Sequence, residues 1–326
     1  MITAVTGATG HVGANLVRAL LDDGRTVRAI NRQRSRALDG LDIEFVSADV
    51  LDADAMRRAL EGVDVVYHLA ALISIAGDPD GTVRATNVDG VRNTATAALH
   101  ADVRRFVHCS SIHAFDLEHP GVITESSARA VRADLPAYSR SKAAGEIELL
   151  KAVDAGLDAV ITNLTGVLGP FDFAPSHIGA VLLALARRRL PALVAGGFDW
   201  VDARDAAAGM IAAEVKGRTG ERYLLGGYRQ SMVDLAALAE RATGVRAPRG
   251  VVPLWLARAT SPAGLWWARW RGNEPLFTPE SLRALAADPT VSWVKATREL
   301  GYEPRPTQET VDDVYAWFRE TGALAP

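Results

Sequence analysis

The start of the chain constrains the fold most, because a short apolar strand there leads directly into a glycine-rich loop and then into an apolar helix. We expect the strand over residues 2–6 and the helix over 11–23, with the loop Gly-Ala-Thr-Gly-His-Val-Gly at 7–13. In such a loop the first glycine permits a tight turn, the second lets a pyrophosphate approach the backbone, and the third lets the helix pack on the strand. The helix N-terminus then offers amide groups and a positive dipole to phosphate. This context predicts dinucleotide binding.

The first half of the chain continues this alternation of short apolar strands with longer amphipathic helices. The order predicts right-handed crossovers and a parallel sheet. Largely apolar strands such as 63–69 suit a sheet that is covered on both faces. We expect the further strands at 26–31, 43–46, 63–69, 105–110 and 158–162, and the further helices at 53–61, 82–100 and 138–155.

The second half is less regular and becomes mainly helical beyond Ser231, with prolines between the helices. We therefore predict a Rossmann-type, doubly wound α/β domain and a smaller, mostly helical substrate-binding cap on the carboxyl side of the sheet. The Trp-rich stretch 254–270 is expected to form a helical hairpin with its indoles turned inward. The predicted domain spans 1–169 with 196–226 returning to it, and the cap comprises 170–195 and 227–326.

Composition excludes several classes of partner. The 326 residues include 36 Lys and Arg against 39 Asp and Glu, a net charge of −3, so no basic field favours nucleic acid or an anionic membrane. The single Cys109 excludes a disulfide framework and a cysteine zinc cluster, and the seven histidines lack metal-ligand spacing, so we expect no metal. No targeting peptide or membrane span is evident, and we expect a cytoplasmic protein.

The end of the second strand bears on the choice of cofactor. An acid there would accept a hydrogen bond from the ribose 2′-hydroxyl of NAD, but the chain has Asn31 followed by Arg32. A guanidinium at this place suits a 2′-phosphate. The sequence thus favours NADP(H), with NAD(H) as the alternative. Asp49, after the third strand, either accepts a hydrogen bond from the adenine amino group or belongs to the N-terminal region of the next helix.

Tyr138 and Lys142 stand four residues apart, which places both side chains on one face of a predicted helix. A free tyrosine titrates near ~10, but a neighbouring ammonium lowers its pKa. Such a tyrosine can give a proton to a carbonyl oxygen or take one from an alcohol. Ser110 and Ser111 end the preceding strand, at the edge where open α/β sheets bind ligands. One of these two hydroxyls is expected to polarise a substrate carbonyl.

A set of short motifs occurs in one order along the chain: Gly7–Gly13, His68–Ala71, Asn87–Gly90, Ser110–Ser111, Tyr138–Lys142, Gly166–Pro170, Val201–Asp205 and Leu300–Tyr302. Together these motifs resemble the extended short-chain dehydrogenase/reductases, which belong to the NAD-dependent epimerase/dehydratase superfamily. Within that family the chain looks most like the dihydroflavonol-reductase-like branch, near the 3β-hydroxysteroid dehydrogenases. The resemblance extends over nearly the whole chain.

The resemblance implies a role for each matching residue. Tyr138 would be the acid/base, Ser111 would polarise the carbonyl, and Lys142 would bind the nicotinamide ribose and lower the pKa of Tyr138. Leu164 stands where the family usually has a proline that shapes the nicotinamide pocket, so the chain departs from the family pattern at this position. The residues expected to contact the cofactor are Gly7, Thr9, Gly10, His11, Val12, Gly13, Arg32, Asp49, Val50, Leu69, Ala70, Asn87, Tyr138 and Lys142.

The expected function is an NADP(H)-dependent carbonyl reductase or alcohol dehydrogenase acting on a small-molecule substrate. A nucleotide-sugar epimerase or dehydratase with tightly bound NAD and a non-catalytic NADP-sensing protein are the alternatives. His113, Ser176 and His177 are candidates for substrate contact, and each has a structural role as its alternative. The resemblance also implies a homodimer through the helices near 88–100 and 138–151, with a monomer as the alternative.

Overall fold

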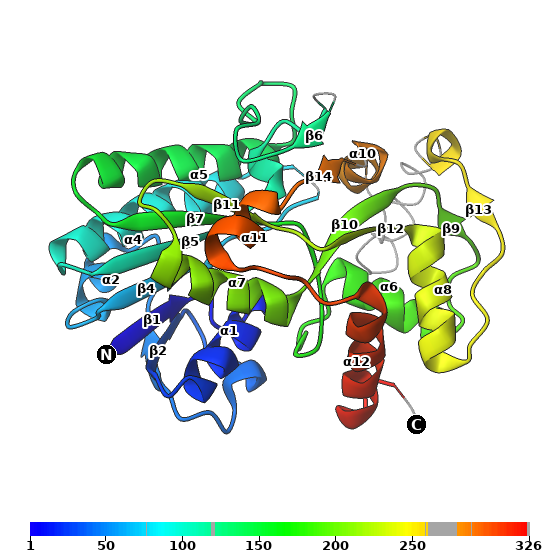
Figure 1. The fold of residues 1–326 in the computed structure, drawn as a ribbon, viewed down its shortest axis with the longest axis horizontal. Helices are drawn as coiled ribbons and strands as arrows, with labels where there is room; N and C mark the ends of the chain where they lie inside the picture. Colours follow the sequence, from blue (N-terminus) through cyan, green and yellow to red (C-terminus); the bar gives the residue numbers. More distant parts are fainter. Residues whose placement is uncertain (76, 119–120, 258, 260–278, 288, 325–326) are drawn as a thin grey trace.

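A seven-stranded parallel sheet forms the centre of the molecule in a computed structural model (Figure 1), which describes all residues except 76, 119–120, 258, 260–278, 288 and 325–326. The strand order is β11-β7-β5-β4-β1-β2-β3. The chain winds outward from β1 in both directions, which confirms the predicted doubly wound α/β fold. The strands are β1 (Ile2–Thr6), β2 (Thr26–Asn31), β3 (Glu44–Ser47), β4 (Val65–His68), β5 (Arg105–Ser111), β7 (Ala159–Leu164) and β11 (Arg222–Leu225).

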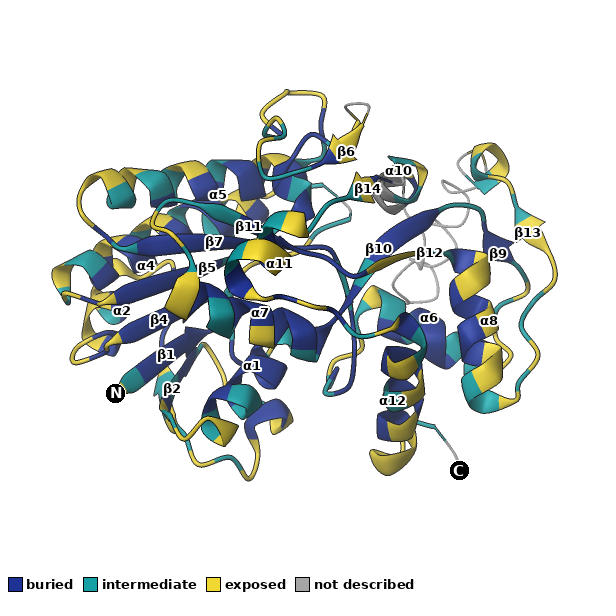
Figure 2. Ribbon diagram, in the orientation of Figure 1, coloured by how far each residue is buried: buried dark blue, intermediate teal, exposed yellow. Residues whose placement is uncertain are grey.

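Helices cover both faces of this sheet, which explains why its central strands are buried along most of their length, whereas the edge strand β3 has no buried residue (Figure 2). On one face α1 packs beside α7, and apolar side chains of both helices join the sheet in one core cluster. On the other face α2, α4 and α5 form a second cluster. These helices are α1 (His11–Asp22), α2 (Ala53–Ala59), α4 (Gly90–His100), α5 (Ala137–Asp154) and α7 (Ala203–Lys216).

A second, smaller sheet leads away from the first toward the C-terminal helices (Figure 1). Its central strand β10 (Gly197–Asp202) pairs in parallel with β8 (Gly166–Leu168) and antiparallel with β12 (Tyr228–Ser231). A third apolar cluster packs beside this sheet and joins the helices over residues 177–186, 232–243 and 307–320. Further elements include α6 (His177–Ala186), α8 (Met232–Thr243), α10 (Pro279–Ala287), α11 (Val294–Leu300), α12 (Thr307–Glu320) and the short strands β6 (Val122–Ile123), β9 (Leu193–Val194), β13 (Val251–Val252) and β14 (Thr290–Val291).

The division of the chain into two domains stays a prediction. Residues 196–226, predicted to return to the large domain, contribute β11 to the large sheet, whereas their other strand, β10, belongs to the second sheet. Most of the expected Trp-rich hairpin lies outside the described residues. Trp255 is described, and its side chain is 70% exposed rather than turned inward. Among the helices that the structure describes, none has the length and apolar character needed to cross a membrane.

The long helix expected over residues 82–100 is the clearest local difference. It consists of a short α-helical start at Thr82–Arg84, a π-helical turn at Ala85–Asp89, and α4. The π-helical turn packs against α5 so closely that a Cβ on Gly145 would lie 2.3 Å from the carbonyl oxygen of Asn87. Such turns are frequent at functional sites, and this one carries Asn87.

Candidate active site

The glycine loop lies at the point where the order of the strands reverses, between β1 and β4. Gly7 adopts φ +69°, and a Cβ there would lie 2.7 Å from the amide nitrogen of Ala70. On Gly13 a Cβ would lie 2.2 Å from the carbonyl oxygen of Gly7. On Gly10 the nearest atom would be 3.4 Å away, so this glycine is not required for packing. The packing thus explains the first and third glycines and leaves the second for a ligand.

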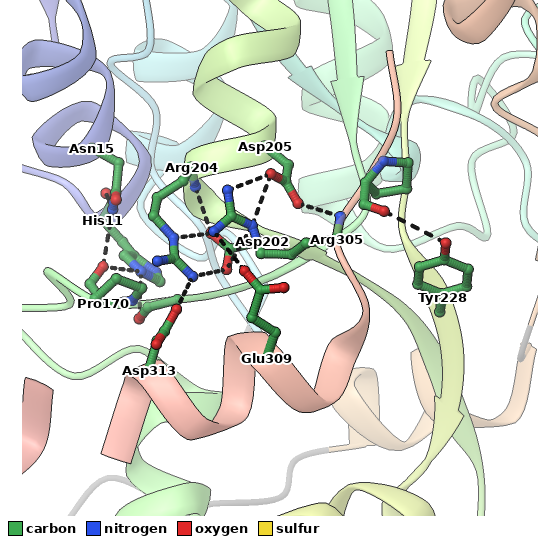
Figure 3. Close-up of polar contacts among 12 residues, drawn as sticks. His11, Asn15, Pro170, Asp202, Arg204, Asp205, Tyr228, Arg305, Glu309 and Asp313 are labelled. Atoms are coloured by element: carbon green, nitrogen blue, oxygen red, sulfur yellow. Dashed lines mark hydrogen bonds and ion pairs between the residues drawn. The ribbon is translucent and has the colours of Figure 1, made fainter. Parts of the chain in front are cut away.

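The N-terminus of α1 fits the pyrophosphate of a dinucleotide. Its N-cap residue is Gly10, and no side chain caps its first amide groups, so these donors remain for an anion. The side chain of His11 is turned elsewhere, because its Nε2 lies 3.1 Å from the carbonyl oxygens of both Gly169 and Pro170 (Figure 3). Asn15 donates to the Pro170 oxygen as well. His11 therefore ties the loop to the end of β8 through its ring.

At the end of β2, where the adenosine ribose of a dinucleotide would lie, Asn31 donates to the hydroxyl of Thr9 at 2.9 Å. Asn31, which stands in the place of an acid, therefore holds the glycine loop. The Arg32 side chain is exposed and has no hydrogen-bond or ion-pair partner among the residues that the structure describes. It is available to a 2′-phosphate. A carboxylate oxygen of Asp49 accepts the amide of Leu51, whereas the N-cap of α2 is Asp52. Asp49 is therefore not the capping residue of that helix.

The structure separates the roles of the two serines at the end of β5. Ser110 is buried and donates to the carboxylate of Glu146 at 2.7 Å. The hydroxyl oxygen of Ser111 accepts the amide of His113 at 3.2 Å, and the Ser111 hydroxyl lowers the pKa of the Tyr138 phenol. Only the second serine faces the candidate acid/base.

Tyr138 differs from the expectation in one respect. Burial raises the pKa of its phenol to about 12, and the Ser111 hydroxyl offsets only part of that rise. Lys142 is not among the groups that lower this pKa in the structure, where its Nζ donates to the carbonyl oxygen of Cys109 at 3.0 Å. The expected lowering of the pKa of Tyr138 is therefore wrong for this state of the protein. The phenol is protonated at neutral pH and is a proton donor.

Lys142 is itself buried, with 3% of the residue exposed. Burial lowers the pKa of its ammonium, while Cys109 and Glu146 act in the opposite direction. Its Nζ has one described acceptor, the Cys109 carbonyl oxygen. Because an ammonium has three donors, two of them are available to groups of a bound cofactor or to water.

The side chain of Asn87 lies beside this site and hydrogen-bonds two segments of the chain. Its side-chain Oδ1 accepts the backbone amide of Leu72 at 2.8 Å, and its Nδ2 donates to the Leu72 carbonyl oxygen and to the hydroxyl of Ser141, the residue before Lys142. Asn87 therefore joins the loop after β4 to α5. The sequence placed this residue at the cofactor side of the site, and in the structure its side chain binds the protein itself.

Glu146 was not among the residues expected at the site, although it lies one turn beyond Lys142 on α5. It is completely buried, and its carboxylate accepts Ser110 and the amide of Asn163, at 2.6 Å from the latter. Arg222 forms an ion pair with it at 3.1 Å. Asn163 also donates to the carbonyl oxygen of Ser111. The i, i+4 spacing from Lys142 was the available signal, because such residues share a helix face.

The three residues predicted to contact substrate lie in different surroundings. The ring of His113 lies 5.6 Å from that of Tyr138, edge to face, and stacks on Phe198 at 6.0 Å. Ser176 is the N-cap of α6 and is hydrogen-bonded to Asp172, and His177 is exposed at the start of that helix. Only His113 is brought to the Ser111–Tyr138 pair by a described contact.

The remaining predicted positions lie around the same edge. Leu164, in the place of the family proline, is the buried last residue of β7 and pairs with Ser111 in the sheet. Val50 is buried and would be 2.8 Å from a Cβ on Gly90, so it packs beneath α4. Leu69 and Ala70 donate their backbone amides to the Thr6 hydroxyl. No group of His, Cys, Asp and Glu within the described ranges could hold a metal ion.

The fold and this site together define an NAD(P)-dependent enzyme of the extended short-chain dehydrogenase/reductase type. Residues 3–226 match the NAD dependent epimerase/dehydratase family, and the chain belongs to that family.

Named proteins are similar to this chain over nearly its whole length. The chain is 38% identical to sterol demethylase protein B of Methylococcus capsulatus, over 99% of this chain and 100% of the relative. It is 34% identical to a putative dihydroflavonol 4-reductase of Synechocystis, over 98% and 94%. A dTDP-glucose 4,6-dehydratase of Streptomyces venezuelae, solved with NAD bound, superposes with a TM-score of 0.79 at 25% identity, covering 100% of this chain and 99% of that one.

Proposed function

We propose that this protein is an NADP(H)-dependent oxidoreductase that interconverts a carbonyl group and a secondary alcohol. One observation carries the proposal: a protonated Tyr138, whose pKa the Ser111 hydroxyl lowers, lies with that serine at the carboxyl edge of the sheet, on the same edge as the glycine loop. A phenol and a hydroxyl that converge on one point suit a carbonyl oxygen that gains negative charge.

In the reductive direction the residues act as follows. Ser111 and Tyr138 hydrogen-bond the carbonyl oxygen, and Tyr138 gives its proton to that oxygen as the carbon is reduced. Lys142 holds a positive charge near the resulting phenolate. When bound, reduced nicotinamide supplies the hydride. The residues that would hold the cofactor are the N-terminal amides of α1, Arg32 and Lys142.

The preference for NADP(H) rests on Arg32 and on the absence of an acid at Asn31. Arg32 is exposed, whereas Asn31 is engaged with Thr9 and offers no carboxylate to a ribose 2′-hydroxyl. A nucleotide-sugar epimerase or dehydratase is the second candidate, favoured by the family description and by the likeness to the dTDP-glucose dehydratase. Those reactions retain NAD, so purified protein with stoichiometric NAD would favour that candidate.

The test is a panel of aldehydes, ketones and steroids assayed with NADPH and NADH in parallel, on the wild type and on Arg32→Ser. We expect turnover with NADPH, and a KM for NADPH that rises about tenfold or more in the variant, because a guanidinium–phosphate pair is a strong charge-assisted contact. The KM for NADH should not change. Arg57→Ser is the matched control, since Arg57 is also exposed but pairs with Asp54 on α2. Equal effects on both cofactors would contradict the assignment of Arg32.

A further inference from the structure

Two histidines lie side by side beneath the candidate active site. In the sheet Thr6 pairs with His68, and His68 pairs with His108, so the three side chains form one row across β1, β4 and β5. The same row continues to Ile30 and Ile161, which belong to the apolar cluster under α4 and α5. The row therefore faces the helix that carries Lys142. Each histidine is 1% exposed, and their rings stack at 5.5 Å.

The hydrogen bonds of Thr6 fix the tautomer of His68. The Thr6 hydroxyl oxygen accepts the amides of Leu69 and Ala70, each at 3.2 Å. Its own proton is then directed to the Nδ1 of His68, 2.9 Å away. A neutral imidazole that accepts at Nδ1 carries its proton on Nε2. His68 thus presents a buried N–H donor.

That donor has no protein partner among the described residues, and neither does either ring nitrogen of His108. Buried polar groups in proteins are nearly always hydrogen-bonded, and leaving one unpaired costs about 1–3 kcal/mol. The stacked geometry, with an interplanar angle of 19°, does not let the two rings bond each other. Three buried nitrogens at one place therefore call for internal water, which in proteins bridges such groups.

Lys142 lies next to this pair. Its Nζ donates to the carbonyl oxygen of Cys109, the residue that follows His108. The charge of Lys142 lowers the pKa of both histidines in addition to the effect of burial. The pKa of His68 falls to about 3, so the pair is neutral at physiological pH. A neutral imidazole both donates and accepts, and it can therefore orient water toward an ammonium.

We propose that His68 and His108 hold internal water against Lys142 and so keep its ammonium solvated in a buried site. The two histidines are positioning residues in this account, because they act on the reaction only through Lys142. The inference rests on the proposed function for its effect on the reaction, but the bound water is a property of the protein alone.

The charged and titratable groups around the pair are few. Lys142 faces it from α5, Cys109 neighbours it on β5, and Glu146 lies one turn further along α5 and raises the pKa of Lys142. Tyr138 shares α5 with Lys142. In the proposed reaction Lys142 holds a positive charge near the Tyr138 phenolate, so a loss of water beneath Lys142 should favour its neutral amine, remove that charge and make the phenolate harder to form.

The first experiment looks for the water directly, in a high-resolution crystal structure of the wild-type protein. We expect ordered water hydrogen-bonded to the free ring nitrogens of His68 and His108 and connected to the Nζ of Lys142. Protein atoms in place of the water, or a dry space around the rings, would overturn the proposal. This result does not depend on turnover. An inactive protein would therefore contradict the proposed function but would leave the proposal about internal water untouched.

The second experiment compares His108→Leu with His108→Gln in the direction of alcohol oxidation, over pH 6–10. In His108→Leu the apparent pKa for kcat/KM should rise by about one unit, which equals a tenfold loss at neutral pH. The polar His108→Gln should restore most of that loss, and affinity for NADP⁺ measured by fluorescence should be similar in both. His100→Leu on the exposed end of α4 is the control. A pH profile of His108→Leu that matches the wild type would overturn the proposal.

Discussion

At the scale of single residues, neighbours in the sequence have separate roles because successive side chains of a strand point to opposite faces. Ser110 is directed to the buried Glu146, and Ser111 to Tyr138. The sequence identified the serine pair, and only the resemblance selected the second member. The high pKa of Tyr138 was not predictable, since it depends on burial by residues distant in the sequence.

His113 provides a residue-scale prediction about stability. Burial lowers the pKa of its imidazole to about 4, below the ~6.5 of an unfolded chain. Between these values the unfolded state binds the extra proton, so stability is complete above pH ~6.5 and falls as the pH decreases toward 4. From pH 7 to 5 this one group should cost about 2 kcal/mol. In urea unfolding at pH 7 and pH 5, the free energy of unfolding of the wild type should fall by that much more than that of His113→Phe. Parallel losses in the two proteins would contradict the account.

At the scale of elements, the glycine loop and the sheet were predictable because their signals are local: short, largely apolar runs for the strands and glycines at fixed offsets. The π-helical turn at Ala85–Asp89 was not, because its sequence is an ordinary helical one. Its shape accompanies the contact between Asn87 and Gly145 of α5, and such a contact exists only once the layers are assembled. The polar cluster around Glu146 escaped prediction for the same reason.

Two glycines of the loop should respond differently to alanine. Gly13→Ala places a Cβ 2.2 Å from the Gly7 carbonyl oxygen, so it should lower the free energy of unfolding by about 2 kcal/mol or more. Gly10→Ala meets nothing closer than 3.4 Å and should fold normally. It should still weaken cofactor binding at least tenfold, because its methyl group points where the pyrophosphate would approach. Unfolding curves and NADPH titrations separate the two effects, and equal destabilisation would contradict this division.

At the scale of the whole molecule, a network of ion pairs joins α12 and the segment before it to the end of β10 and the start of α7 (Figure 3). The Asp202 side chain is fully buried and accepts Arg204 at 2.7 Å, and Arg204 also reaches Asp313 on α12. Arg305 pairs with Asp205 at 2.8 Å. The sequence motif around Asp202 was visible, but its partners on α12 lie about a hundred residues further along and carry no local signal.

This network gives a prediction about stability of the whole fold. Arg204→Met leaves the buried Asp202 with Arg305 as its remaining described ion-pair partner, at 3.6 Å. Breaking one side of a buried pair costs about 3–5 kcal/mol. Arg298→Met is the control, because the Arg298 side chain is 70% exposed and its pair with Glu299 should be worth about 1 kcal/mol or less. Urea unfolding of the two variants measures the difference, and similar losses would show that the network is not structural.

The most direct test of the central claim is Tyr138→Phe, assayed for carbonyl reduction with NADPH under conditions where the wild type turns over. The variant keeps the ring and its contact with His113 but has no proton to give. We predict that kcat falls by about a thousandfold or more, in line with loss of a general acid, while the Kd for NADPH stays within about twofold. Turnover at the wild-type rate would contradict the assignment of Tyr138 as the proton donor.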